Sequence, residues 1–233
     1  MFDPEILLEE SPLFNHGKKS RYKFEGKGVP SVTELLQFID SEGLVSWANR
    51  MGKMGIDNRV ILDHAAEFGT LVHEQIEYYL KGKPIPTEET VCLTAFKQWW
   101  SELNRCHKVK IKGQEQPMVT KYFAGTYDLL LSIDGKPYLI DFKTSNHVGY
   151  KYFMQLAAYR YLLYHVKNVN IQGCVILQFD KKKPQCNEYA LDFSNDEHFY
   201  MIEACFHSFM GLVYTYYNTK QAGRCFRSVF TIR

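Results

Sequence analysis

Two apolar runs, residues 122–133 and 137–143, are separated by little more than Asp134 and Gly135, and this arrangement strongly constrains the fold of the 233-residue chain. An Asp-Gly pair between apolar runs predicts a tight β-hairpin. A helical stretch at 150–166 follows the hairpin, and further apolar strands come after it. Strands that alternate with helices pack as a sheet covered by helices. The sequence therefore predicts an α/β fold with a central mixed β-sheet flanked by helices.

The remaining predicted elements lie on both sides of this hairpin. Ser31, with Glu34 three residues later, gives the capping-box pattern of a helix start. Further helices are predicted at 31–40, 60–81, 88–105 and 195–218. A short strand and turn is predicted at 21–30, and further strands are predicted at 114–120, 172–180 and 186–193. We expect one domain over residues 1–233, made of a mainly helical N-terminal region (1–110), a sheet core (111–193) and a C-terminal helix and tail (194–233).

Composition excludes several classes of protein. Lys plus Arg (28) nearly balance Asp plus Glu (26), so a nucleic-acid partner must be attracted by local basic patches. No apolar run approaches the ~20 residues of a membrane span, and the N-terminus lacks the pattern of a signal peptide. The six cysteines are scattered without a Cys-x-x-Cys pair, which predicts reduced thiols and argues against zinc or iron–sulfur ligation. We expect an intracellular protein, in bacterial or host cytoplasm or an organelle matrix.

The pattern Asp-x-Lys occurs three times. The copy at 134–136 lies in the predicted hairpin turn, and the copy at 180–182 enters a lysine-rich turn that we expect to be solvated. In the third copy, Asp141 and Lys143 end an apolar strand. Residues two apart on a strand project from the same face, so these two charged side chains point the same way.

Asp128 lies on the strand that should pair with residues 137–143. Antiparallel pairing can bring Asp128, Asp141 and Lys143 to one place. Two neighbouring carboxylates resist joint ionisation unless a cation lies between them, and oxygen ligands favour Mg²⁺ or Mn²⁺. The alternative is an ion pair between Asp141 and Lys143 with Asp128 solvated separately.

Two helices carry further polar residues at helical spacing. Gln155 and Tyr159 share one face of the helix that follows the strand, although an ordinary amphipathic helix would also explain them. Gly69 and His73 have the same spacing in an earlier helix. A glycine inside a helix costs ~1 kcal/mol relative to alanine, and a close backbone approach would explain it. For His73 alone, a packed or solvated side chain is the simpler interpretation.

Together these motifs resemble a known family. The order Gly-x-x-x-His (69–73), Gly-x-x-Asp (125–128), Asp-x-Lys (141–143) and Gln-x-x-x-Tyr (155–159) is similar to that of the RecB-like branch of PD-(D/E)xK nucleases, which includes phage and mitochondrial-type exonucleases. The resemblance covers residues 29–165. It implies a restriction-endonuclease-like nuclease core. Iron–sulfur members of the branch carry a cysteine cluster that this chain lacks.

The resemblance also implies a metal site of one or two Mg²⁺ or Mn²⁺ ions. Asp128 and Asp141 would bind the ion with their carboxylates, helped by the backbone carbonyl of Phe142. His73 would be a further ligand.

Other roles follow from the same resemblance. Glu115 matches a glutamate that helps to bind a second ion, with Glu74 as a competitor for this role. Lys143 would orient or activate the attacking water and offset charge at the phosphorus. Gln155 and Tyr159 would hold the DNA strand beside the site.

Basic clusters are candidates for phosphate contacts, with a solvated basic surface as the alternative. Lys181, Lys182 and Lys183 form one cluster. The other clusters are Lys18, Lys19, Arg21 and Lys23 near the start and Lys220, Arg224, Arg227 and Arg233 in the tail. Four aromatic residues are candidates for stacking on bases: Trp99, Trp100, Tyr150 and Tyr152. We expect most of the four to belong to the core instead.

These features predict a metal-dependent deoxyribonuclease. Metal ions supply a nucleophilic water and neutralise phosphate charge in phosphodiester hydrolysis. An exonuclease that acts on single- or double-stranded DNA ends in replication, recombination or repair is favoured, because the small chain has no obvious recognition module. The alternatives are an endonuclease on the same core and a nuclease-fold protein that binds DNA without cutting it. Two further partners are considered: a recombination or replication protein, and a second copy of the chain.

Overall fold

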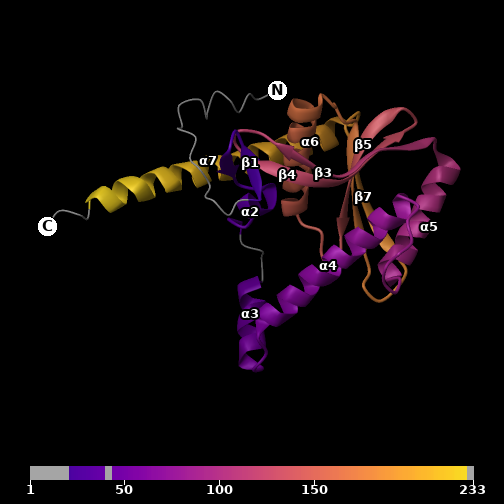
Figure 1. The fold of residues 1–233 in the computed structure, drawn as a ribbon, viewed down its shortest axis with the longest axis horizontal. Coiled ribbons are helices and arrows are strands. Elements are labelled where there is room, and N and C mark those ends of the chain that lie inside the picture. Colours follow the sequence, from indigo (N-terminus) through magenta and orange to yellow (C-terminus); the bar gives the residue numbers. More distant parts are fainter. Residues whose placement is uncertain (1–20, 40–43, 230–233) are drawn as a thin grey trace.

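The computed structural model describes residues 21–39 and 44–229, with the backbone alone for 44, 45 and 221–229. Figure 1 shows the order of the elements along the chain. They are β1 (Tyr22–Phe24), β2 (Lys27–Val29), α2 (Val32–Leu36), α3 (Leu44–Lys53), α4 (Asn58–Leu80), α5 (Val91–Cys106), β3 (Val109–Val119), β4 (Ala124–Ile133), β5 (Lys136–Lys143), α6 (Tyr150–Lys167), β6 (Gly173–Phe179), β7 (Cys186–Asp192) and α7 (Asp196–Val229).

A mixed five-stranded sheet forms the centre of the molecule, in the order β3-β4-β5-β6-β7. β5 and β6 run parallel and are connected through α6, whereas the other neighbours are antiparallel. The predicted hairpin between β4 and β5 is confirmed. Asp134 and Gly135 both adopt positive φ, 52° and 87°, as a two-residue hairpin turn requires. The predicted α/β class with a mixed sheet flanked by helices is also confirmed.

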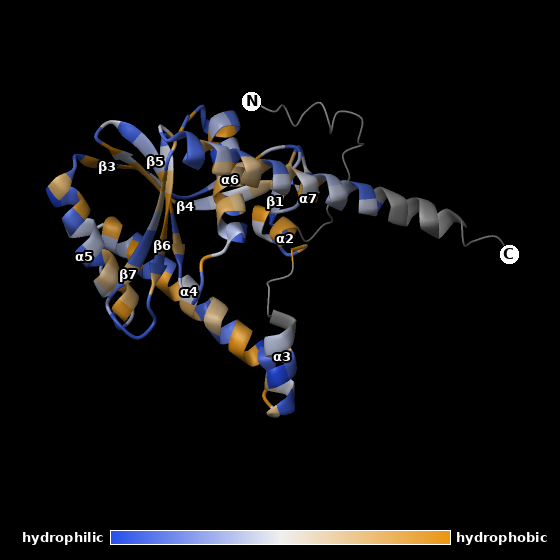
Figure 2. Ribbon diagram, turned by 180° about the vertical axis from the view of Figure 1, so that it is seen from behind, coloured by the Kyte–Doolittle hydropathy of each residue, from blue (hydrophilic) through white to orange (hydrophobic). Residues whose placement is uncertain are grey.

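The two faces of the sheet are covered by different helices, because side chains alternate along each strand. Leu139 and Ile176 pack into a core with α6, α7 and the short α2. Ile140 and Leu177, their neighbours in sequence, pack into a second core with α4 and α5. Figure 2 shows apolar residues, in orange, along the central strands between the two helical layers. The strand ends that carry Asp141 and Lys143 therefore belong to a sheet that is buried on both faces.

Several boundaries differ from those predicted. The capping box of Ser31 and Glu34 is confirmed at the start of α2. However, β3 begins at Val109 rather than 114, because its first residues lie at an exposed sheet edge with little apolar pattern. The final helix continues beyond 218 to Val229. Helix α3 was not predicted; it is a short amphipathic helix at the end of α4 farthest from the sheet (Figure 1).

Within the described ranges, no helix is long and apolar enough to cross a membrane. The five cysteines described there carry free thiols, as the sequence predicts, and they are Cys92, Cys106, Cys174, Cys186 and Cys205.

Candidate metal centre

Strands β4 and β5 separate at the position where their two aspartates lie. The last paired residues are Leu129 and Ile140, so Asp128 and Asp141 come directly after the pairing ends. The backbone N–H of Phe142 donates to the Asp128 carboxylate at 2.7 Å. A buried amide must find an acceptor, and here a side chain supplies it. This hydrogen bond fixes the Asp128 carboxylate in the opening between the strands.

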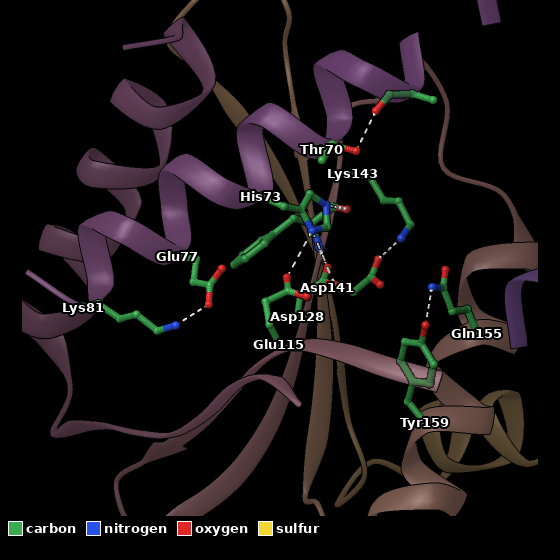
Figure 3. A network of polar contacts seen from close by, with 12 residues as sticks. Thr70, His73, Glu77, Lys81, Glu115, Asp128, Asp141, Lys143, Gln155 and Tyr159 are labelled. Atoms are coloured by element: carbon green, nitrogen blue, oxygen red, sulfur yellow. Dashed lines mark hydrogen bonds and ion pairs between the residues drawn. The ribbon is translucent and has the colours of Figure 1, made fainter. Parts of the chain in front are cut away.

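Three ligand-type side chains from separate elements meet at this opening. His73 of α4, Glu115 of β3 and Asp128 of β4 offer ligand atoms that all lie within 4.8 Å of one another. His73 Nδ1 is 3.5 Å from Glu115 Oε1 and 3.6 Å from Asp128 Oδ1. Figure 3 shows the imidazole on α4 facing both carboxylates. One nitrogen and two carboxylates form a donor set that can hold a divalent ion.

The orientation of the His73 ring is set by the loosened end of β5. Its Nε2 lies 3.2 Å from the carbonyl oxygen of Phe142. A proton on Nε2, donated to this carbonyl, leaves Nδ1 directed at the carboxylates, where a metal ion would replace the proton on Nδ1. Burial alone lowers the pKa of His73, but the charge of Asp128 and the hydrogen bond to Glu115 outweigh it and raise that pKa to about 9. The negative site therefore attracts positive charge.

Glu115 occupies a strained backbone position. Its φ is +45°, in the left-handed region that non-glycine residues rarely adopt. The pairs that flank it in the β3–β4 ladder place it opposite Asp128. Like charges on opposite residues of two strands destabilise a sheet. Backbone strain such as the positive φ of Glu115 clusters at functional sites. The glutamate is held here despite both costs, and nothing in the sequence signals its backbone conformation. Glu74, the competitor, lies outside the three-residue group.

Asp141 and Lys143 form a buried ion pair beside this group. Asp141 is 1% exposed, and its Oδ2 lies 2.5 Å from Lys143 Nζ. Neither carboxylate oxygen of Asp141 accepts a hydrogen bond of regular geometry from the described residues. Almost all buried polar atoms in proteins have such partners. An incompletely satisfied, buried carboxylate next to three ligand-type groups fits a site that receives a cation.

The charge states of this pair follow from burial and proximity. Burial raises the pKa of Asp141 to about 6, although Lys143 opposes this shift. Burial lowers the pKa of Lys143, but the charges of Asp141 and Asp128 outweigh it and raise that pKa. Both groups are therefore ionised at neutral pH. The Lys143 ammonium also lies 5.0 Å from the ring centroid of Tyr152, a contact that the sequence pattern does not signal.

The two aspartates lie close together but have different nearest partners. The charge of Asp128 contributes to the raised pKa of Asp141, so the two carboxylates are neighbours. Yet the group of mutually close ligand atoms in the described chain contains Asp128 and not Asp141. Lys143 neutralises Asp141 directly, because a buried carboxylate needs a nearby positive charge. Asp141 thus stands next to the three-residue group with Lys143 as its partner.

Gln155 and Tyr159 lie behind the carboxylates, in the core. They are 8% and 4% exposed, and the Gln155 amide donates to the Tyr159 hydroxyl at 2.9 Å (Figure 3). Gly125 explains how the Tyr159 ring fits, because a Cβ at Gly125 would lie 2.5 Å from its Cε1 atom. The two residues share one helical face, as predicted, but that face packs against β4.

Gly69 does not have the close backbone approach expected of it. A Cβ there would meet the Thr144 hydroxyl oxygen at 3.5 Å, an ordinary contact. Instead, Gly69 lines a pocket of about 480 Å³ together with His73, Glu115 and Arg21. The missing side chain leaves open space beside the group of His73, Glu115 and Asp128. This pocket connects the site with solvent.

Among the basic clusters, the one near the start of the chain contributes Arg21 to the pocket beside His73 and Glu115. Lys181, Lys182 and Lys183 are exposed on the turn between β6 and β7. Lys18, Lys19 and Arg233 lie outside the described residues, as do the side chains of Arg224 and Arg227.

The aromatic candidates belong mostly to the core, as expected. The rings of Trp99 and Trp100 pack on Phe96 in the core beneath α4 and α5. Tyr150 is the exception, since it is 56% exposed.

Comparisons with known proteins do not assign a function to this site. No family model matches the chain, and no curated protein matches it. The crystal structure of SSO0001 is 17% identical with a TM-score of 0.42, and the alignment covers 82% of this chain and 79% of that one. The structure of a phage-related exonuclease from Haemophilus somnus 129PT is 12% identical with a TM-score of 0.33, covering 67% and 83%. Likenesses this weak carry no argument about activity.

Proposed function

We propose that the protein is a metal-dependent deoxyribonuclease of the PD-(D/E)xK type, RecB-like branch, with residues 1–233 as one nuclease domain. An exonuclease that hydrolyses DNA from its ends in replication, recombination or repair is the form we favour. One observation carries the proposal: three ligand-type groups converge beside a buried Asp–Lys pair at the opening between β4 and β5. The resemblance in motif order to PD-(D/E)xK nucleases is the reason for proposing DNA as the substrate.

The chain offers the ligands that such a reaction needs. His73, Glu115 and Asp128 would hold a Mg²⁺ or Mn²⁺ ion, with Asp141 and the Phe142 carbonyl beside them. A bound divalent ion lowers the pKa of its water and neutralises charge on phosphate oxygens. The carboxylates fix the position of this charge before DNA arrives. Such preorganised electrostatics is usually the largest contribution to catalysis.

Lys143 would act as a fixed cation. Its pKa is raised, so it stays an ammonium at neutral pH rather than serving as a general base. The ion pair with Asp141 directs its amine at the site. From there it would orient the attacking water and stabilise charge that develops on the phosphorus oxygens. Gln155 and Tyr159, which are buried, would support the strands from behind, and contact with DNA would require them to become exposed.

A cleavage assay on DNA of different topology tests the proposal. End-labelled linear DNA and covalently closed circular DNA are incubated with Mn²⁺, with Mg²⁺ or with EDTA. We expect linear DNA to shorten from its ends only when metal is present, and circles to survive. Cut circles would instead indicate an endonuclease, and intact linear DNA under every condition would leave only a binding protein. The Asp128→Asn variant, purified in parallel, excludes a contaminating nuclease.

A further inference from the structure

A second pocket lies where the parallel strands β5 and β6 end. Its volume is about 510 Å³, within the ~300–1,000 Å³ typical of ligand sites. Ser145 and Asn146 line it from the loop after β5, and residues between 178 and 187 line it from the β6–β7 hairpin. Ligands of open α/β sheets bind beyond the carboxyl ends of the strands. Because Ser145 is two residues after Lys143, this pocket, which we call the amide pocket, adjoins the metal centre along the chain.

A buried glutamine fixes one wall of the amide pocket. Gln178 is 7% exposed and pairs in register with Lys143 across the β5–β6 ladder. Its amide nitrogen donates to the Ser145 carbonyl at 2.8 Å, and its oxygen accepts from Asn187 and Tyr189. These bonds tie the loop after β5 to β7. The pocket is therefore built before any ligand binds.

The accessible side chains of the amide pocket are of two kinds. Asn146, Gln185 and Asn187 are exposed amides, and Lys181 and Lys182 are exposed ammonium groups. An amide presents a donor and an acceptor together, which is the pattern that reads the edge of a nucleobase. Lysines bind phosphates. Amides between lysines thus match a nucleotide better than they match a simple anion.

The carboxylate in this lining is held by the backbone of the turn. Asp180 accepts hydrogen bonds from the backbone N–H groups of Lys182 and Lys183, at 2.7 and 3.1 Å. The turn is also held against α4, because Lys181 Nζ lies 5.8 Å from the ring centroid of Phe68. The positive charge of the turn therefore stays at a fixed place beside the amides.

The shape of the amide pocket selects between the two forms of DNA. In a duplex, base edges are reached only by elements that enter a groove. A concave pocket instead receives a base that has left the stack, whose Watson–Crick edge is free. The metal-binding group is recessed in the same way, since the side chain of Asp128 is 10% exposed.

Resting on the proposed nuclease function, we infer that the amide pocket binds an unpaired nucleotide of the strand whose phosphate lies at the metal centre. Asn146, Gln185 and Asn187 contact the base, and Lys181 and Lys182 contact the neighbouring phosphates. The substrate class of the enzyme is then a single-stranded DNA end.

Binding measured without cleavage tests this assignment. Fluorescence anisotropy of a labelled single-stranded oligonucleotide and of a blunt duplex is followed in EDTA over a range of salt concentrations. We expect the wild-type protein to bind the single strand more tightly. The double variant Asn146→Ala, Gln185→Ala should lose about tenfold in single-strand affinity with little change for the duplex, as for loss of one good base contact.

The lysines give a second readout with a matched control. Lys181→Ala combined with Lys182→Ala should flatten the slope of log affinity against log salt by about 1.4 for the single strand, or ~0.7 for each phosphate contact. Lys110→Ala combined with Lys112→Ala removes the same charge from exposed positions on β3, at the opposite edge of the sheet. This control pair should leave the slope unchanged.

Failure of the inference is distinguishable from failure of the proposed function. An amide variant that binds the single strand as the wild type does, or that weakens single strand and duplex equally, overturns the assignment even if the wild type cleaves DNA. Equal slopes for the two lysine pairs overturn it as well. A wild-type protein that cleaves no DNA with Mn²⁺ or Mg²⁺ refutes the nuclease proposal, on which the inference rests.

Discussion

The ends of β5 and β6 carry the same Asp-x-Lys pattern in opposite environments. Asp141 is buried, pairs with Lys143, and its pKa is raised by burial to about 6. Asp180 is exposed, and the backbone hydrogen bond from Lys182 lowers its pKa. The two strands are parallel neighbours, so both patterns lie at the same end of the sheet.

The difference comes from the neighbouring chain. At the end of β5, Asp128 and His73 add charges and α4 excludes water. At the end of β6, the chain enters a solvated turn, as the sequence predicts. The Asp-x-Lys pattern therefore provides the charged groups, and burial decides how strongly these charges interact.

The largest effect is expected for the two lysines. Lys143→Ala should lower the rate of DNA cleavage by about 10²–10³-fold, the usual loss when one preorganised charge-stabilising group is removed. Lys136→Ala, in the copy of the pattern at the hairpin turn, should stay within about twofold at saturating DNA, because it is an exposed surface substitution. The rates come from single-turnover cleavage of end-labelled DNA.

Folding must be checked for this pair, since Lys143→Ala leaves Asp141 buried without its partner, at a cost of about 3–5 kcal/mol. The double variant Asp141→Asn, Lys143→Ala removes that unpaired charge and should recover stability without recovering cleavage. Wild-type rates in Lys143→Ala would show that the ammonium has no catalytic role.

The two aspartates should differ in metal binding. Asp128→Asn keeps an acceptor for the Phe142 amide, and Asp180→Asn keeps one for Lys182. Mn²⁺ at about 100 times its Kd should stabilise the wild type and Asp180→Asn by about 2.7 kcal/mol. Asp128→Asn should lose most of this gain because a charged ligand is missing. Thermal unfolding with and without Mn²⁺ gives the result, and equal gains in both variants would remove Asp128 from the site.

The two motif glycines should respond in opposite directions. Gly125→Ala forces a Cβ against the Tyr159 ring and should reduce the free energy of unfolding by about 1–3 kcal/mol. Gly69→Ala meets only an ordinary contact with Thr144 and should stabilise helix α4 by up to ~1 kcal/mol. Urea denaturation measures both. A strongly destabilised Gly69→Ala protein would mean that α4 packs more tightly than the structure shows.

The smallest effect concerns two glutamates with left-handed backbone. Glu115 and Glu25 have φ of 45° and 47°. Replacing either by glycine should raise the stability of the metal-free protein by about 1 kcal/mol, since strain is relieved but the unfolded chain gains freedom. Stabilisation by Mn²⁺ should weaken only in Glu115→Gly. Isothermal titration with Mn²⁺ separates the two, and full affinity in Glu115→Gly would exclude this glutamate as a ligand.

Much of the fold was predictable because local chemistry and periodicity agree with it. The Asp134–Gly135 turn, the capping box at Ser31 and the apolar strands each follow from a few adjacent residues. The exposed edge of β3 and helix α3 were not predictable in the same way. The first residues of β3 are mostly exposed, and α3 packs on α4 outside the two buried cores, so neither is tied to the core pattern that identifies the other elements.

Local sequence specifies which groups are available: two aspartates and a lysine at strand ends, a histidine four residues after a glycine, and a glutamine and a tyrosine at helical spacing. Which of these groups meet depends on tertiary packing. Long-range packing places His73 and Glu115 beside Asp128, pairs Asp141 with Lys143 and buries Gln155 with Tyr159. The distances between these groups, and the exclusion of water around them, depend on segments that are far apart in the chain. Electrostatic energies depend on these distances and on the exclusion of water.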